Sequence, residues 1–122
     1  MKKHTQSSDR PRYAPFDIVV VPFSYADRLA EKRRPALVVS GIKLAPYGLL
    51  WVAMITSAEN EPWPSDVVID DMERTGLPAP SVVRPAKIAC VEIARVERRI
   101  GHLDKAPARI VAQRLKAFMG AA

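Results

Sequence analysis

The apolar stretches of this chain are short, and two of them are bounded by proline. Residues 18–21 form a β-branched run that Pro22 closes, and residues 36–39 form a second run that Pro35 opens. Proline fixes its own φ and cannot donate to a β-ladder, so it is confined to strand ends, edges and turns. With 11 prolines against 5 glycines, the chain is expected to form short elements broken by turns.

Between residue 49 and the C-terminal region, the sequence also predicts only short elements. Residues 70–76 are expected to form one helical turn, with Asp70 or Asp71 as the cap and Gly76 as the end. Four other stretches have the pattern of strands or extended chain, namely residues 49–56, 66–69, 81–83 and 87–96.

The C-terminus is the one place where the sequence predicts a longer helix. Asp104 is a good N-cap, Pro107 is tolerated in the first turn, and Gly120 supplies the stop. An apolar stripe is expected at Ile110, Val111, Leu115, Phe118 and Met119, with Arg109, Arg114 and Lys116 facing solvent. Short strands with one terminal amphipathic helix predict a mainly β fold, a small and strongly bent barrel with the helix packed on it.

The length of the chain limits the number of domains, and its net charge indicates what kind of partner it binds. The 122 residues suffice for one core, so we expect one domain at residues 15–122 behind a poorly ordered basic tail at residues 1–14. Lysine and arginine number 19 against 13 acidic residues, and this net charge of +6 favours an anionic partner. Charge alone leaves RNA, DNA, a membrane surface and an acidic protein open.

The sequence also bears on the compartment. Cys90 is the only cysteine, so no internal disulfide can form, and its apolar surroundings predict an inert core thiol. Residues 1–12 lack the apolar segment of a secretory signal, and no apolar run is long enough to span a membrane. We therefore expect a cytoplasmic protein.

Three cations run directly into the second apolar stretch. Lys32, Arg33 and Arg34 precede Pro35, which biases Arg34 toward an extended backbone. We place residues 24–34 in a cationic loop between two strands. The following strand, residues 49–56, ends in Thr56 and is followed by Ser57. Two neighbouring strands can put an arginine and a hydroxyl side by side.

From residue 16 to residue 120 the chain resembles the MazF/PemK-type toxins of bacterial type II toxin–antitoxin systems. The motifs that carry the resemblance are Asp17-Ile18-Val19-Val20-Val21-Pro22-Phe23, Arg33-Arg34-Pro35-Ala36-Leu37-Val38-Val39-Ser40, Ala53-Met54-Ile55-Thr56-Ser57, Gly76-Leu77, Ser81-Val82-Val83 and Arg99-Ile100-Gly101-His102-Leu103. Two positions depart from the family pattern. Phe16 stands where most members have glycine, and Leu29 stands where some have an acidic residue, with Glu31 nearby but out of register.

The resemblance implies a compact SH3-like barrel that forms a homodimer. It further implies a sequence-selective endoribonuclease that cuts single-stranded RNA, such as mRNA, without a metal or other cofactor, and that a cognate antitoxin inhibits. In the family, the arginine of the Arg-Pro pair and a threonine at the end of the third strand are catalytic. On this chain these residues are Arg34 and Thr56.

Metal-free RNA cleavage proceeds by attack of a 2′-OH on its own phosphate, so the site must stabilise charge on phosphate oxygens and move two protons. The planar fork of Arg34 can hold a phosphate through two donors and keeps its charge. Thr56 can donate a hydrogen bond to a phosphate oxygen or orient the 2′-OH. The general acid and base stay open, because His4 lies in the tail and His102 is interpreted as structural.

Further residues are expected to contact RNA through charge or stacking. Trp63, between two prolines, can stack on an unpaired base or pack against the barrel or a dimer mate. The predicted RNA contacts are Lys32, Arg33, Ser57, Trp63, Arg84 and Lys87. No metal site is expected at Asp66, Asp70 and Asp71, since no further ligand is spaced to complete one.

Two alternatives stay open at this point. The same fold is shared with gyrase-poisoning toxins, so the chain can also be a non-catalytic toxin or binder that acts on a protein such as DNA gyrase. An SH3-like peptide or nucleic-acid module without toxicity is the third possibility.

Overall fold

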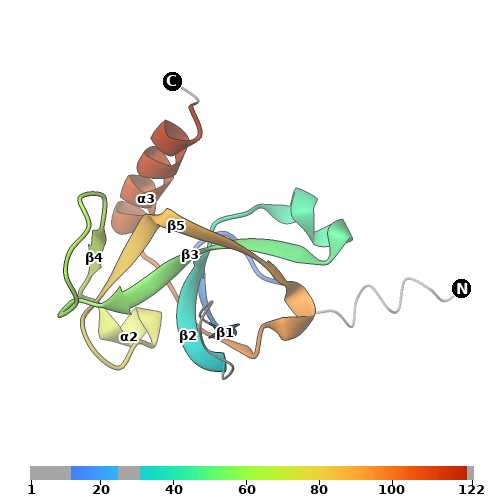
Figure 1. Ribbon diagram of the computed structural model, residues 1–122, viewed down its shortest axis with the longest axis horizontal. Helices are drawn as coiled ribbons and strands as arrows, with labels where there is room; N and C mark the ends of the chain where they lie inside the picture. The colour runs from blue at the N-terminus through green and yellow to red at the C-terminus, as the bar shows by residue number, and fades with distance from the viewer. Residues whose placement is uncertain (1–11, 25–30, 121–122) are drawn as a thin grey trace, which may run out of the picture.

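The computed structural model describes residues 12–24 and 31–120 (Figure 1). The elements in chain order are β1 (Asp17–Ser24), β2 (Glu31–Val38), the 3-10 helix η1 (Ile42–Tyr47), β3 (Leu49–Ser57), β4 (Val67–Ile69), α2 (Met72–Thr75), β5 (Ser81–Glu92), the 3-10 helix η2 (Ile93–Arg95), β6 (Arg98–His102) and α3 (Lys105–Phe118). The predicted mainly β chain with a C-terminal helix is confirmed. Within the described residues, no helix has the length and apolar character needed to cross a membrane.

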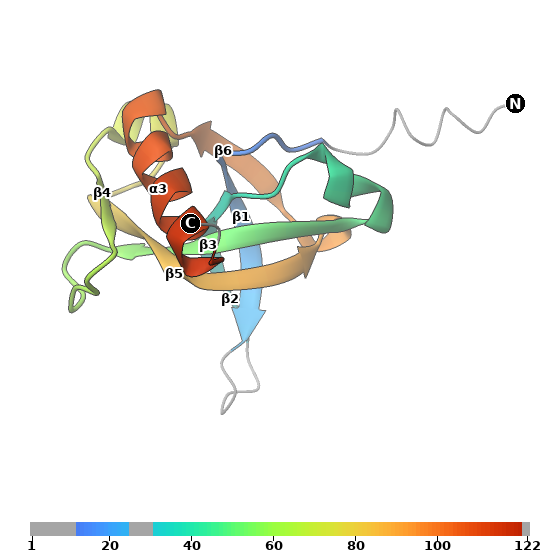
Figure 2. The same cartoon turned by 90° about the horizontal axis from the view of Figure 1, so that it is seen from above.

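The strands form one antiparallel sheet in the order β4-β5-β3-β2-β1-β6. The sheet curls strongly, and in Figure 2 β1 runs across the direction of β3 and β5, with α3 lying over β5. A register shift between Ala53 and Met54 helps the curl, because Ala53 pairs with Ile88 whereas Met54 pairs with Arg84. The expected small, strongly bent barrel with a packed helix is confirmed.

Both faces of the central strands are buried, which explains their unbroken apolar runs. Ile18, Leu37 and Ile55 point into one cluster, together with Ala108 and Val111 of α3. The alternate positions form a second cluster on the other face, namely Val19, Val21, Ala36, Val38, Leu50 and Val52. The helix therefore covers one face of the curled sheet, and the sheet folds over the other.

The first two strands are longer than predicted. β1 continues past Pro22 to Ser24, and β2 begins at Glu31, so Arg34 lies inside a strand and not in a loop. The proline is tolerated because β1 pairs with β6 only up to Val20 and keeps one open edge beyond it. Three parts of the predictions lie outside the described residues: residues 1–11 of the tail predicted at residues 1–14, residues 25–30 of the predicted loop, and Leu29.

β5 corrects two predictions. It is one strand from Ser81 to Glu92 that bends at residues 85–87, where the sequence predicted two separate segments. Cys90 was expected in the core, but it is exposed. The reason is its register: Cys90 lies opposite Trp51, whose side chain is also exposed, so this pair faces outward from the sheet.

The short helix α2 follows from local chemistry and a close approach. The Asp71 carboxylate accepts from the backbone N–H of Arg74 at 3.0 Å, and Gly76 ends the helix at φ +71°. A methyl group on Gly101 would overlap backbone atoms of Arg74 and Thr75. Glycine at position 101 therefore lets β6 lie directly against α2.

The helix α3 begins at the predicted cap and shows a narrower buried face than predicted. Ala108 and Val111 are buried, whereas Ile110, Phe118 and Met119 of the expected stripe are exposed. Arg114 was predicted to face solvent. It is half-buried, and its guanidinium donates to backbone carbonyls of the loop before β4.

Candidate functional site

Arg34 and Thr56 lie where two neighbouring strands part. The β2–β3 ladder runs over Ala36–Val38 and Val52–Met54 and ends at the pair Ala36 and Met54. Pro35 has no N–H to donate, which is a physical reason for the ladder to stop there. Beyond it, β2 stays paired with β1 alone and β3 with β5 alone. Arg34 and Thr56 are each two positions past the last pair.

The two side chains point to the same side of the sheet. Residues two apart on a strand share a face, so Arg34 follows Ala36 and Thr56 follows Met54, which lie opposite each other. Both side chains are half-buried. Lys32 has the same parity as Arg34 and is exposed. The strand register thus puts a guanidinium, a hydroxyl and a second cation on one face of β2 and β3. Their joint action on RNA stays a prediction.

Arg33 belongs to the opposite face of β2. Its Nε donates to Oε1 of Glu97 at 2.6 Å, and Arg95 donates to Oε2 of Glu31 at 2.6 Å. The structure therefore does not bring Arg33 to the face of Arg34 and Thr56. Its guanidinium is still largely exposed, and its contact with RNA stays a prediction.

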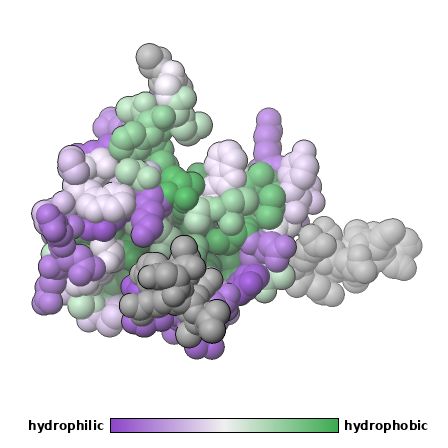
Figure 3. Space-filling model, in the orientation of Figure 1, coloured by the Kyte–Doolittle hydropathy of each residue, from purple (hydrophilic) through white to green (hydrophobic). Residues whose placement is uncertain are grey.

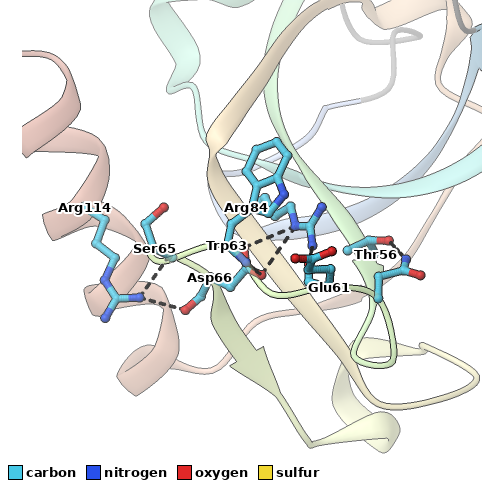
Figure 4. Close-up of polar contacts among 8 residues, drawn as sticks. Thr56, Glu61, Trp63, Ser65, Asp66, Arg84 and Arg114 are labelled. Carbon is cyan, nitrogen blue, oxygen red and sulfur yellow. Dashed lines mark hydrogen bonds and ion pairs between the residues drawn. The ribbon is translucent and has the colours of Figure 1, made fainter.

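A tight turn after β3 holds a partner for Thr56 that the sequence analysis missed. The backbone N–H of Asn60 donates to the carbonyl of Ser57 at 3.1 Å, and the Ser57 hydroxyl accepts from the N–H of Glu59 at 3.2 Å. The turn carries the Asn60 side chain back over the strand end, where its Nδ2 donates to Oγ1 of Thr56 at 2.5 Å (Figure 4). Serine at the first position of a turn was the available signal.

Arg84 anchors the loop that follows this turn. Its Nη2 donates to the carbonyl of Glu61 at 2.5 Å, and its Nε lies 3.3 Å and 3.4 Å from the two carboxylate oxygens of Asp66. Its Cζ lies 4.4 Å from the ring centre of Trp63. Only 11% of the Arg84 side chain is exposed. The structure places this predicted RNA contact in the support of the loop, as Figure 4 shows.

The helix α3 holds the same loop from its other side. Arg114 donates to the carbonyls of Ser65 and Asp66 at 3.0 Å and 2.8 Å. Trp63, between the two arginine anchors, is 38% exposed. The loop is thus fixed at both ends, and it presents part of an indole to solvent. Lys87, in the bend of β5, is exposed.

His102 is the last residue of β6 and pairs with Asp17 at the start of β1, whereas Arg34 pairs with Val21, farther along β1. Its Nδ1 is 2.9 Å from Oδ1 of the buried Asp17, whose other oxygen accepts from the N–H of Ala14 at 2.9 Å. Burial raises the pKa of the nearby Tyr13 phenol; Arg99 opposes the rise and Asp17 adds to it. In residues 12–24 and 31–120, no three His, Cys, Asp or Glu side chains are grouped to hold a metal ion.

A separate apolar hollow of about 810 Å³ lies between α3 and the outer side of the sheet. Figure 3 shows hydrophobic surface running from α3 into this hollow. Its lining is mainly apolar, with Ser40 and Lys43 as its polar members and Leu44, Trp51, Pro85, Ile88, Leu115, Phe118 and Met119 as its large apolar ones. The large apolar side chains of Trp51, Ile88, Phe118 and Met119 are all exposed. Such a surface is typical of an interface.

Comparison with known proteins gives a consistent result. The family model described as "PemK-like, MazF-like toxin of type II toxin-antitoxin system" matches residues 14–119. The fold is similar to the Mycobacterium tuberculosis toxin MazF-mt6, with a TM-score of 0.67 and 22% identity over 85% of this chain and 96% of that one.

Two solved complexes are also similar. MazE-MazF from Deinococcus radiodurans has a TM-score of 0.73 and 20% identity over 90% of this chain and 97% of that one. An endoribonuclease in complex with its cognate antitoxin from Mycobacterial species has a TM-score of 0.72 and 13% identity over 91% and 98%. No curated protein matches the sequence.

Proposed function

Because the chain belongs to the PemK-like, MazF-like toxins of type II toxin–antitoxin systems, we propose that it is a metal-independent, sequence-selective endoribonuclease. It cleaves single-stranded RNA, mRNA included, by attack of a 2′-OH on the adjoining phosphate. The observation that carries the proposal is the placement of Arg34 and Thr56 on one face, just past the end of the β2–β3 ladder. The solved mycobacterial relative named as an endoribonuclease supports the same reaction class.

The chemistry of the two side chains fits this reaction. A guanidinium holds two phosphate oxygens at once, and its attraction grows as the transition state gains negative charge. The Thr56 hydroxyl supplies a further donor to the same phosphate. Lys32, exposed on the same face, attracts the RNA backbone without reading its sequence. The partly exposed ring of Trp63 offers a stacking surface for an unpaired base.

Cleavage of a long, mixed-sequence RNA by the purified protein in excess EDTA tests the proposal. We expect new ends that carry a cyclic or terminal phosphate, as 2′-OH attack requires. Loss of one preorganised donor to the transition state costs about 10²–10³ in rate, so Arg34→Ala is expected to reduce cleavage by that factor. The matched control is Arg109→Ala, which removes the same charge from the exposed side of α3 and is expected to retain most activity.

Two results would contradict this reading. Unchanged cleavage by the Arg34→Ala variant would remove the mechanism. Intact RNA after treatment with folded wild-type protein would favour the alternative, a toxin of this fold that acts on a protein such as DNA gyrase.

We also propose two protein partners. A second copy of the chain covers the apolar hollow beside α3, since its exposed Trp51, Phe118 and Met119 form the kind of surface that dimers bury. A cognate antitoxin covers the cationic face of Arg34 and Lys32 and thereby excludes RNA. The solved Deinococcus radiodurans MazE-MazF complex supports an antitoxin partner. Sedimentation of the purified protein tests the dimer. We place the action in the cytoplasm, where mRNA is translated.

A further inference from the structure

The hydroxyl of Thr56 has a side-chain partner whose chemistry restricts what that hydroxyl can do. Nδ2 of Asn60 donates to Oγ1 of Thr56 at 2.5 Å. A threonine hydroxyl has one O–H donor and two acceptor lone pairs, and an amide NH₂ can only donate. The bond from Asn60 therefore uses a lone pair of Thr56 and leaves its O–H to be donated elsewhere.

The direction of this bond suits a phosphate. Phosphate oxygens only accept, so a hydroxyl that binds them must donate. Donation from Asn60 into the Thr56 oxygen also polarises the O–H and makes it a better donor, because hydrogen bonds in a chain strengthen one another. The bond fixes the side chain of Thr56 in addition, so less conformational freedom is lost when RNA binds.

The backbone around Asn60 is held from both sides. On its N-terminal side, the turn is closed by the bond from the Asn60 N–H to the Ser57 carbonyl at 3.1 Å. On its C-terminal side, the carbonyl of Glu61 accepts from Arg84 at 2.5 Å, and Arg84 is itself held by Asp66. Asn60 is thus supported by the sheet through a neighbouring residue, although its own side chain is exposed.

We propose that Asn60 is a positioning residue for RNA cleavage: it occupies a lone pair of Thr56 and so directs the Thr56 O–H toward the scissile phosphate. This inference rests on the proposed ribonuclease function and deepens it.

The decisive variant is Asn60→Asp, which keeps the shape of the side chain and replaces the donor by an acceptor. An ionised carboxylate would take the Thr56 O–H as its own donor and withdraw it from the RNA. Single-turnover cleavage is expected to fall by about 10–100-fold near neutral pH, with a much smaller change in RNA affinity, as for an interaction made mainly in the transition state. The matched control is Ala58→Asp, which adds the same charge to the same exposed turn.

A pH profile separates this role from a structural one. Protonated aspartate has an O–H to donate, so the rate of Asn60→Asp relative to wild type is expected to recover as the pH falls toward about 4, the ordinary aspartate pKa. Thermal unfolding of each variant establishes that it is folded.

Each outcome bears on the inference. Cleavage by Asn60→Asp equal to that by Ala58→Asp would overturn it, and so would a loss that does not recover at low pH. In both cases wild-type cleavage would leave the ribonuclease proposal standing. Absence of cleavage by the wild-type protein would overturn both proposals together.

Discussion

Phe16 adopts a backbone conformation that normally favours glycine, and replacing it tests how the start of β1 is held. Its φ is +74°, and it is the only non-glycine residue with positive φ in the described chain. Two backbone bonds fix it there: its N–H donates to the Val38 carbonyl at 2.6 Å, and its carbonyl accepts from the Leu103 N–H at 2.9 Å. The ring packs, partly buried, against the core cluster that α3 covers.

The expected effect combines strain, packing and chain entropy. Both Phe16→Gly and Phe16→Ala lose the packing of a half-buried ring, which costs about 1–2 kcal/mol when about half of a full burial is counted. Alanine keeps the left-handed strain of about 1–2 kcal/mol. Glycine removes that strain, but its extra freedom in the unfolded chain costs about 0.5–1 kcal/mol. Phe16→Gly is therefore expected to be more stable than Phe16→Ala by about 0.5–1 kcal/mol.

The assay is urea unfolding followed by the fluorescence of Trp51 and Trp63, with midpoints compared at equal slope. Phe23, partly buried in β1 and without positive φ, provides the matched control. There the order is expected to reverse, with Phe23→Ala more stable than Phe23→Gly by about 0.5–1 kcal/mol. If alanine were as stable as glycine at position 16, the argument from strain would be refuted.

Two further predictions concern packing and pH. Gly101→Ala is expected to lower the free energy of unfolding by about 1–3 kcal/mol, because the added methyl group overlaps the backbone of α2. Gly41→Ala serves as the control, since no atom lies within 4 Å of a methyl group added there. Equal urea midpoints for the two variants would contradict the prediction. The pKa of the Tyr13 phenol is raised above 10.0 in the folded state, so the folded state binds the phenol proton more tightly than the unfolded state does. The resulting contribution to stability is fully present below pH 10.0 and is lost as the pH rises through the folded pKa. Tyr13→Phe should lose less stability over that alkaline range in pH-dependent urea unfolding, and identical pH profiles would count against it.

The sequence predicts the features that depend on neighbours along the chain. The cap at Asp71, the stop at Gly76 and the start of α3 after Asp104 follow from local chemistry. The placement of Arg34 and Thr56 near neighbouring strands also follows, since β2 and β3 are consecutive strands and pair directly. Arg34 itself lies inside β2 and not in the predicted loop. Pro35, which has no N–H to donate, lies directly beyond the last pair of their ladder.

The features that depend on contacts between separate segments of the chain could not be predicted. Arg84 looked like one more exposed cation, because nothing in the sequence shows that Glu61 and Asp66 return to it. Cys90 was expected in the core because its neighbours are apolar, but the strand is flanked on that side by the outward-facing Trp51. Nothing in the sequence marks Asn60 as a partner of Thr56, because one tight turn brings it back to the end of β3.

The two ion pairs at the outer end of β2 have a consequence for strand register. A slip of one residue between strands is excluded by burial, since it turns every apolar side chain outward. A slip of two residues keeps the faces and needs another safeguard. Glu31 pairs with Arg95, and Arg33 pairs with Glu97. A slip of two residues would therefore place Glu31 beside Glu97 or Arg33 beside Arg95. Glu97 is bound to β1, because its N–H donates to the Val20 carbonyl at 2.9 Å. Each exposed pair contributes little to stability, yet through Glu97 they favour the correct alignment of β2 with β1 over the nearest alternative that the core would accept.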